Sequence, residues 1–224
     1  MPKEAKILAT VGLLVLLGAV ALIIVKPSTT PAPKVIDSTV LTRANSHTVA
    51  GNTPVVGGIS TTKVSVVEFG DYQCPACGYA HPIFKKVIAE YASNPNVSFT
   101  FRNYPLPMHS NAMISAEAAE AAASQGKFWE MHDMLYEKQS EWSEVANAMQ
   151  YFSVYAKNIG LDVTKFEKEI KDNTHIKAIN ADVADGDSVD VHGTPTFFIN
   201  GAAFGTGNVP TFEEFKAKID SLLI

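Results

Sequence analysis

The chain has very little cysteine: its 224 residues contain only two, Cys74 and Cys77. A structural disulfide stabilises mainly by closing a long loop of the unfolded chain, so a bridge between these neighbours would contribute little. Their number also argues against a structural zinc site, which takes four ligands, because no second cysteine pair completes the set and the nearest other ligand is His81. The pair is better suited to opening and closing as a redox disulfide.

The chain also lacks a run of positive charge. Lysine and arginine number 18 against 23 acidic residues, which gives a net charge of -5, and the basic residues are scattered. This excludes a general nucleic-acid binder, which needs a basic patch. No nucleotide or metal motif is present, so we expect turnover without a cofactor and predict no metal site. His109, His132 and His192 are interpreted as surface or packing residues.

One long hydrophobic run stands near the start of the chain. Residues 7–25 carry no charged side chain, and about 20 such residues are needed to cross a bilayer. We therefore predict a single transmembrane anchor over 7–25, a cytoplasmic N-terminus over 1–6 and an extracytoplasmic domain after it. A cleavable signal peptide is the alternative, since Ala19-Val20-Ala21 has the form of a cleavage site. Residues 26–52, rich in proline, serine and threonine, are predicted to form an extended linker.

Hydrophobic periodicity divides the remainder, residues 53–224, into three parts. A short apolar run, a helical pattern from Pro75 and an alternating run predict a strand–helix–strand unit. The stretch from about 108 to 187 is helical throughout, and it is followed by a predicted hairpin and a last helix. The strands are expected at Lys63–Phe69, Val97–Arg102, Thr196–Ile199 and Ala202–Phe204. Within the helical stretch, breaks are expected at Gln125-Gly126, Ser140–Ser143, Gly160 and Asp172-Asn173, with Asp162 and Asn173 as N-caps.

The cysteine pair falls where the first strand passes into its helix. Free backbone N–H groups and the helix dipole at such a start stabilise a thiolate. Cys74 is therefore predicted to be the nucleophile, more exposed than Cys77 and of low pKa, and Cys77 the resolving thiol that faces the protein. Pro75 suits the first helical turn, where its missing N–H is not needed.

Two segments resemble the signatures of DsbA-like thioredoxin-fold oxidoreductases, closest to the membrane-attached, BdbD-like branch. They are residues 68–77 (EFGDYQCPAC) and residues 192–201 (HGTPTFFING), and residues 101–106 and 126–133 are also similar. The resemblance covers about Lys63 to Leu223. It implies an α/β thioredoxin fold with an inserted all-helical subdomain, and dithiol–disulfide exchange with unfolded or partly folded secreted proteins.

The resemblance also implies roles for three further residues. Thr194-Pro195 would be a cis peptide bond facing the cysteines, where Thr194 backbone groups could pair with an extended substrate; an ordinary turn is the alternative. Glu68 matches a buried acid of the family and would accept the proton of the resolving thiol. A solvent-facing Glu68 is the alternative, and Asp71 is a rival for its role.

The dipeptide between the cysteines, Pro75-Ala76, departs from the best-known DsbA type, which has a histidine there. Ala76 offers no side-chain donor to the Cys74 thiolate, so a less strongly oxidising couple is expected. Asp190 stands where relatives often have glycine, and aspartate tolerates the left-handed conformation.

The leading functional hypothesis is an oxidase that gives its disulfide to secreted proteins and is recharged by a membrane redox partner. A reductase or isomerase would use the same sulfurs in the opposite direction, and a peptide-binding chaperone would not need them. The sequence leaves the three open.

Overall fold

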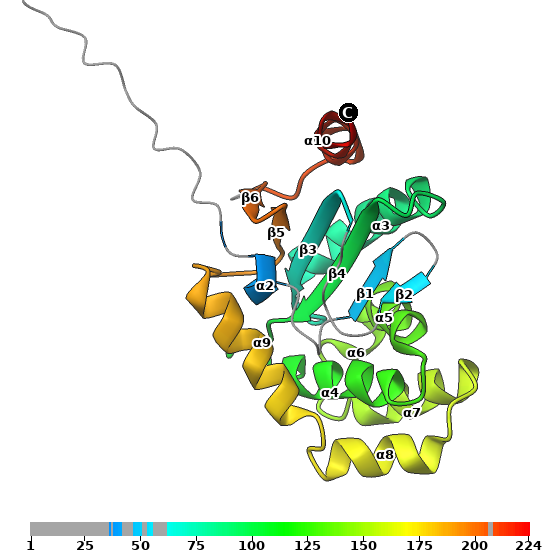
Figure 1. Ribbon diagram of the computed structural model, residues 1–224. Coiled ribbons are helices and arrows are strands. Elements are labelled where there is room, and N and C mark those ends of the chain that lie inside the picture. The colour runs from blue at the N-terminus through cyan, green and yellow to red at the C-terminus, as the bar shows by residue number, and fades with distance from the viewer. Residues whose placement is uncertain (1–35, 37, 42–46, 51–52, 56–61, 206–207) are drawn as a thin grey trace, which may run out of the picture. The chain divides into compact units, whose positions relative to one another are not determined.

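A six-stranded sheet with the order β2-β1-β4-β3-β5-β6 forms the centre of the fold (Figure 1). The computed structural model describes residues 36, 38–41, 47–50, 53–55, 62–205 and 208–224. Neighbouring strands β3 and β4 are parallel, and the other pairs are antiparallel. The strands are β1 (His47–Ala50), β2 (Thr53–Val55), β3 (Val64–Gly70), β4 (Val97–Asn103), β5 (Thr196–Ile199) and β6 (Ala202–Phe204).

The strand–helix–strand unit predicted from the sequence is confirmed. Strand β3 leads into α3 (Pro75–Glu90), and β4 then returns parallel to β3. All residues of β4 and all of β3 except Ser65 are buried, because both faces of the sheet are covered. On one face α3 and α10 (Phe212–Leu223) pack through Phe84 and Phe215 against the strands.

On the opposite face of the sheet lie residues that the sequence assigned to an extended linker over 26–52. There α2 (Ser38–Leu41) lies beside the end of α9 (Ile176–Ser188), and Leu41 is buried with Phe69 and Phe198. Strand β1 also belongs to the domain, because it pairs with β4. The linker prediction is therefore wrong for the described residues between 36 and 50: a one-turn helix and a four-residue strand are too short to give a periodic signal.

The predicted all-helical insertion is confirmed, and it lies at the end of the sheet where β3 and β4 finish (Figure 1). Its core includes Trp142, Met131 and Phe128, and the same cluster contains Cys74 and Cys77. The insertion therefore supplies part of the packing around the cysteines. Its helices are α4 (Ala112–Ala123), α5 (Phe128–Glu137), α6 (Gln139–Trp142), α7 (Met149–Asn158), α8 (Val163–Lys171) and α9.

Most of the predicted breaks within the insertion are confirmed. Gly126 and Gly160 follow helix ends with φ of 75° and 80°, a conformation that glycine adopts without strain. Asp162 caps α8 by accepting a hydrogen bond from the Lys165 N–H. Asn173 is not an N-cap: its φ of 52° ends α8, and His175 precedes α9.

The predicted break at Ser140–Ser143 is confirmed only at its end. The short helix α6 occupies most of that range, and the helical chain is interrupted at Lys138 before α6 and again from Ser143 to the start of α7. The Trp142 side chain, which is fully buried, holds α6 in place because its indole N–H donates to the carbonyl of Leu135 at 2.9 Å.

The hairpin and the last helix form as local signals predict. Asn200 and Gly201 have φ of 48° and 79°, the pair of positive angles that a tight hairpin turn needs. Thr211 and Glu214 make the expected capping box at the start of α10. Asp190 has a φ of 63°, so the left-handed conformation expected there is also confirmed.

Among the described residues, no helix combines the length and the apolarity needed to span a bilayer. The predicted span over 7–25 lies outside those residues.

Candidate functional site

The two cysteines lie at the start of α3, as the sequence predicts. Cys74 is the N-cap residue with φ -66° and ψ 123°, and Pro75 is the first helical residue. Both thiols are free. Cys77 is fully buried and Cys74 is 6% exposed, so Cys74 is the more exposed of the two, as expected. The segment around Pro195 covers its sulfur, whereas Pro75 and Ala76 are exposed.

That covering segment contains the cis peptide bond expected between Thr194 and Pro195. The Cys74 thiol donates a hydrogen bond to the Thr194 carbonyl oxygen at 3.4 Å. The Thr194 hydroxyl is buried and has no hydrogen-bond partner among the described residues. It is therefore available to donate to Cys74 once the thiol has ionised, a role that the sequence reasoning, which considered only the Thr194 backbone, did not find.

The surroundings drive the pKa values of the two thiols apart. The pKa of Cys74 falls from 9.0 to about 5, first because the Cys77 thiol donates to it and then because Thr194 and the backbone N–H groups of Ala76 and Cys77 do. The predicted low pKa is borne out, although the largest cause is the neighbouring thiol rather than the helix start. Burial, the Cys74 hydrogen bond and the charge of Glu68 raise the pKa of Cys77. At neutral pH one thiolate and one thiol therefore lie side by side.

Glu68 lies within β3, opposite Phe101 of β4 and Phe197 of β5 in the strand register. It is 2% exposed, which excludes the solvent-facing alternative. Burial raises its pKa from 4.5 to about 8, so the carboxyl is largely protonated at neutral pH. Its charge also raises the pKa of Cys77, so the two groups are electrostatically coupled.

Asp71 shapes the turn between β3 and α3. Its carboxylate accepts hydrogen bonds from the backbone N–H of Gln73 at 2.8 Å and of Leu106 at 3.0 Å. The second oxygen also lies 2.6 Å from Nδ1 of His109. Asp71 is thus a turn residue, and the partly buried His109, interpreted as a surface or packing residue, contacts its carboxylate.

Gln139, at the start of α6, ties the insertion to the cysteine turn. Its Nε2 donates to the backbone carbonyl oxygens of Tyr72 at 2.7 Å and Cys74 at 2.9 Å. A Cβ atom on Gly78 would meet the Gln139 carboxamide oxygen, so a larger residue there would displace the Gln139 side chain. The sequence holds no local signal for this contact, because the partners are more than 60 residues apart.

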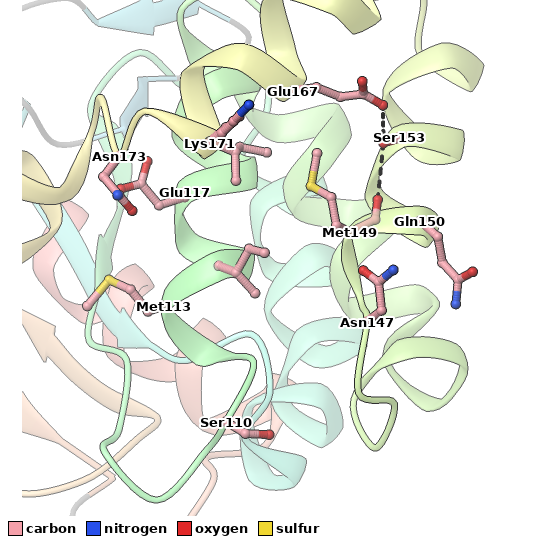
Figure 2. A pocket seen from close by; sticks show the side chains of 12 residues that line it. Ser110, Met113, Glu117, Asn147, Met149, Gln150, Ser153, Glu167, Lys171 and Asn173 are labelled. Carbon is pink, nitrogen blue, oxygen red and sulfur yellow. Dashed lines mark hydrogen bonds between the residues drawn. The ribbon is translucent and has the colours of Figure 1, made fainter.

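Two of the hollows on the described surface lie at or near the elements that carry the site. One, of about 430 Å³, borders the cysteine turn and the cis-proline segment; it is lined by Ala76, Asp190, His192, Thr194, Pro195 and Phe204, among others. The other, of about 670 Å³, lies within the insertion between α4, α7 and α8 (Figure 2). On its wall, dashed lines in Figure 2 join the Ser153 hydroxyl to Glu167 and to the Met149 carbonyl oxygen. The two hydrogen bonds are 2.6 and 3.1 Å long. None of the residues lining this second hollow is a predicted site residue.

The Thr194 hydroxyl provides a test of the thiolate environment. Replacing Thr194 with valine keeps the shape but removes the donor, so the pKa of Cys74 should rise by about one unit, the value of one hydrogen bond to a charged group. Thiolate absorbance followed against pH in the reduced protein measures it. Thr174→Val, at an exposed position, is the matched control; an equal pKa in the Thr194 and Thr174 variants would remove Thr194 from the account.

Comparison with known proteins agrees with this geometry. The family model Thioredoxin_4, described as thioredoxin, matches residues 50–221. Among curated proteins, the Na⁺/H⁺ antiporters NhaA 3 of Salinispora tropica and NhaA 1 of Salinispora arenicola are 41% and 40% identical over 147 residues, or 65% of this chain. The chain aligns with only 21% of the length of each.

Solved structures resemble the whole described domain. BdbD from Bacillus subtilis matches with a TM-score of 0.70 at 21% identity, over 86% of this chain and 99% of that one. Alpha-DsbA1 from Wolbachia pipientis matches with a TM-score of 0.66 at 17% identity, over 80% and 90% of the two chains. These likenesses establish the fold, and the family model establishes the membership. The chain belongs to the thioredoxin family, carries a single Cys-x-x-Cys pair, and shares the fold of BdbD and alpha-DsbA1.

Proposed function

We propose that this protein is a membrane-tethered, extracytoplasmic oxidoreductase that introduces disulfides into unfolded or partly folded secreted proteins. The observation that carries the proposal is the low pKa of Cys74, about 5, beside a Cys77 thiol that stays protonated. A sulfur that is stable as a thiolate is a good leaving group. The groups that stabilise the Cys74 thiolate therefore favour the reduced form of the cysteine pair, which makes its disulfide a stronger oxidant. This supports the direction from protein disulfide to substrate.

The exchange proceeds in two displacements. A substrate thiolate attacks the Cys74 sulfur of the Cys74–Cys77 disulfide, which forms a mixed disulfide and releases Cys77, and Cys77 takes up a proton. A second substrate thiolate then attacks the substrate sulfur of the mixed disulfide, and Cys74 leaves as a thiolate. The substrate loses two electrons and the cysteine pair gains them. A membrane redox partner removes them again and restores the disulfide.

Substrate placement is assigned to the cis-proline segment. The hollow of about 430 Å³ beside Ala76, Thr194 and Pro195 offers an open surface next to Cys74. An extended peptide can lie there and pair with Thr194 backbone groups, so that recognition depends on main chain rather than on one side chain. This suits an enzyme that acts on many unfolded proteins.

Two observations support a location at the membrane. The apolar run over 7–25 has the length of an anchor, and lysines flank it. The matched relatives are Na⁺/H⁺ antiporters, so in those chains a similar segment of sequence is joined to a membrane transporter.

The proposal is tested by trapping mixed disulfides with a Cys77→Ala variant in native cells. Without its resolving thiol, Cys74 should accumulate as a disulfide with secreted proteins and with one membrane protein, its recycling partner. Both classes of adduct should disappear on reduction. If adducts form only with proteins that already carry wrong disulfides, the protein is an isomerase, and if none forms while cellular function persists, it acts as a chaperone; either result rejects the oxidase.

Glu68 is proposed to exchange a proton with Cys77 during each displacement. Glu68→Gln removes the acid but keeps the shape, so exchange should slow by at least about tenfold. Its pH profile should also lose the inflection near pH 8 that the Glu68 pKa gives it. Stopped-flow measurement of exchange with a reduced peptide across pH 5 to 9 tests this, with the exposed Glu144→Gln as control. A profile identical to the wild type would remove Glu68 from the mechanism.

The same substitution should make the protein more stable. The folded pKa of Glu68 is raised above 4.5, so the wild type is fully stable only below that pH and loses stability as pH rises through about 8. At pH 7 the cost is about 3 kcal/mol, at about 1.4 kcal/mol for each pH unit above 4.5. Glu68→Gln avoids this cost, so urea unfolding should show it to be the more stable protein at pH 7 and equal to the wild type at pH 4. Equal stability at both values would show that Glu68 ionises freely.

A further inference from the structure

His81, His132 and Asp133 form a compact polar cluster behind the cysteine turn. His81 lies one helical turn after Cys77 on α3, and His132 and Asp133 are consecutive on α5, which packs against α3. One potential ligand atom from each of the three lies within 4.8 Å of the other two. The exchange reaction described above uses none of these three groups.

The His81 ring presents a buried nitrogen that has no hydrogen-bond partner among the described residues. Its Nε2 atom is buried and makes no hydrogen bond to a described residue, although the side chain is only 6% exposed. A buried ring nitrogen in that state is costly unless something binds it. The nearest carboxylate oxygen, Oδ1 of Asp133, is 3.5 Å away. Ligand atoms of a tetrahedral zinc ion at 2.0–2.1 Å lie about 3.4 Å apart, so this spacing already fits.

His132 supplies the second ring. Its Nδ1 lies 3.1 Å from the Tyr72 hydroxyl, which leaves Nε2 as the nitrogen that can face the cluster. Metal-binding histidines are commonly oriented in this way, through a hydrogen bond at the other ring nitrogen.

The charges around the cluster favour a cation. Lys85 Nζ contacts Oδ2 of Asp133 at 2.7 Å, which leaves Oδ1 to point toward His81. The same ammonium also contacts Glu137 at 2.7 Å, so two carboxylates face one lysine beside the two rings. Asp133 is 34% exposed, which gives an ion and its water a way in from solvent.

We propose that His81, His132 and Asp133 bind one divalent transition-metal ion of the zinc type, with water completing the tetrahedron. Two imidazole nitrogens and one carboxylate oxygen match zinc and its neighbours in the first transition series, whereas calcium and magnesium prefer oxygen alone. The wider separations, up to 4.8 Å, close by small side-chain movements on the partly exposed side of the cluster. The site contains neither cysteine, so it is distinct from the redox pair.

Titration of the full-length chain with zinc chloride tests the site. Cys74 and Cys77 are first changed to serine, so that thiolates do not bind zinc themselves. Calorimetry should then show one zinc ion per chain. His81→Gln and Asp133→Asn should each weaken binding by at least about tenfold, because each removes one of three protein ligands. His192→Gln, at an exposed histidine outside the cluster, should leave the affinity unchanged.

A further variant should increase the affinity for zinc. Lys85→Gln removes the ammonium that competes for Asp133, and at a half-exposed position it does not endanger folding, so zinc should bind severalfold more tightly. Cobalt in place of zinc should give the strong visible absorption of a tetrahedral site, and this should be lost in His81→Gln. The proposal is overturned if the parent protein binds no stoichiometric zinc, or if His81→Gln and Asp133→Asn bind as tightly as the parent.

Discussion

Replacing Cys74 with serine should abolish disulfide exchange. Serine has nearly the same shape, but its hydroxyl does not ionise at neutral pH and forms no mixed disulfide. No other residue can substitute, because Cys77 is the only remaining thiol; it is fully buried, and its pKa is raised by burial. Turnover of a reduced model peptide should therefore fall to the uncatalysed rate, while the circular dichroism spectrum stays that of the wild type.

A matched control separates loss of chemistry from damage to the helix. Tyr79→Ser places the same side chain on α3 at a position that is 69% exposed, and it should retain exchange activity. If the Cys74→Ser protein exchanged disulfides at even a tenth of the wild-type rate, Cys74 would not be the attacking sulfur.

Removing Arg102 should cost the fold about 3–5 kcal/mol of unfolding free energy, the expected cost of breaking a buried ion pair from one side. Arg102 is 1% exposed in β4, and its guanidinium donates to Asp182 at 2.7 Å and to Asp185 at 2.6 Å. It also donates to the carbonyl oxygens of Val40 and Leu41 at 2.8 and 3.0 Å. Arg102→Ala would leave both carboxylates buried without their cation and release α2 from the sheet.

Urea unfolding at pH 7 measures the loss. Arg102→Lys keeps the charge but replaces the guanidinium fork with a single point of contact, so it should fall between the wild type and Arg102→Ala. The loss should also shrink toward pH 5, because the pKa of Asp182 is already raised to about 6, chiefly by burial, and a protonated Asp182 needs no cation. A loss below 1 kcal/mol at pH 7 would show that the cluster does not hold α2 and α9 to the sheet.

The parts of the fold that were predicted correctly depend on local signals. Thr196–Ile199 followed by Asn200-Gly201 specifies a strand and its turn within six residues, and Thr211 with Glu214 marks a helix start in four. Strand β1 could not be predicted in this way. Its four residues pair on one side with the three-residue strand β2 and on the other with β4, some 50 residues later in the chain, so tertiary pairing rather than a local pattern joins it to the sheet.

The contrast between local and long-range signals also holds for the site. Only two residues separate Cys74 from Cys77, so the motif and the helix start are visible in the sequence itself. Its hydrogen bond to Thr194 spans 120 residues, and only the family resemblance indicated that contact. The pairing of Asp71 with His109 and of Tyr72 with His132 has no sequence signal at all, since tertiary packing alone brings these residues together.

The most direct test of the account is the ionisation of the Cys74 thiol in the reduced wild-type protein. Alkylation by iodoacetamide, read at Cys74 by mass spectrometry as a function of pH, reports it, and the wild type is required because the Cys77 thiol is the largest cause of the shift. The account predicts a rate that is half-maximal near pH 5, whereas a midpoint near the ordinary value of 9.0 would contradict it.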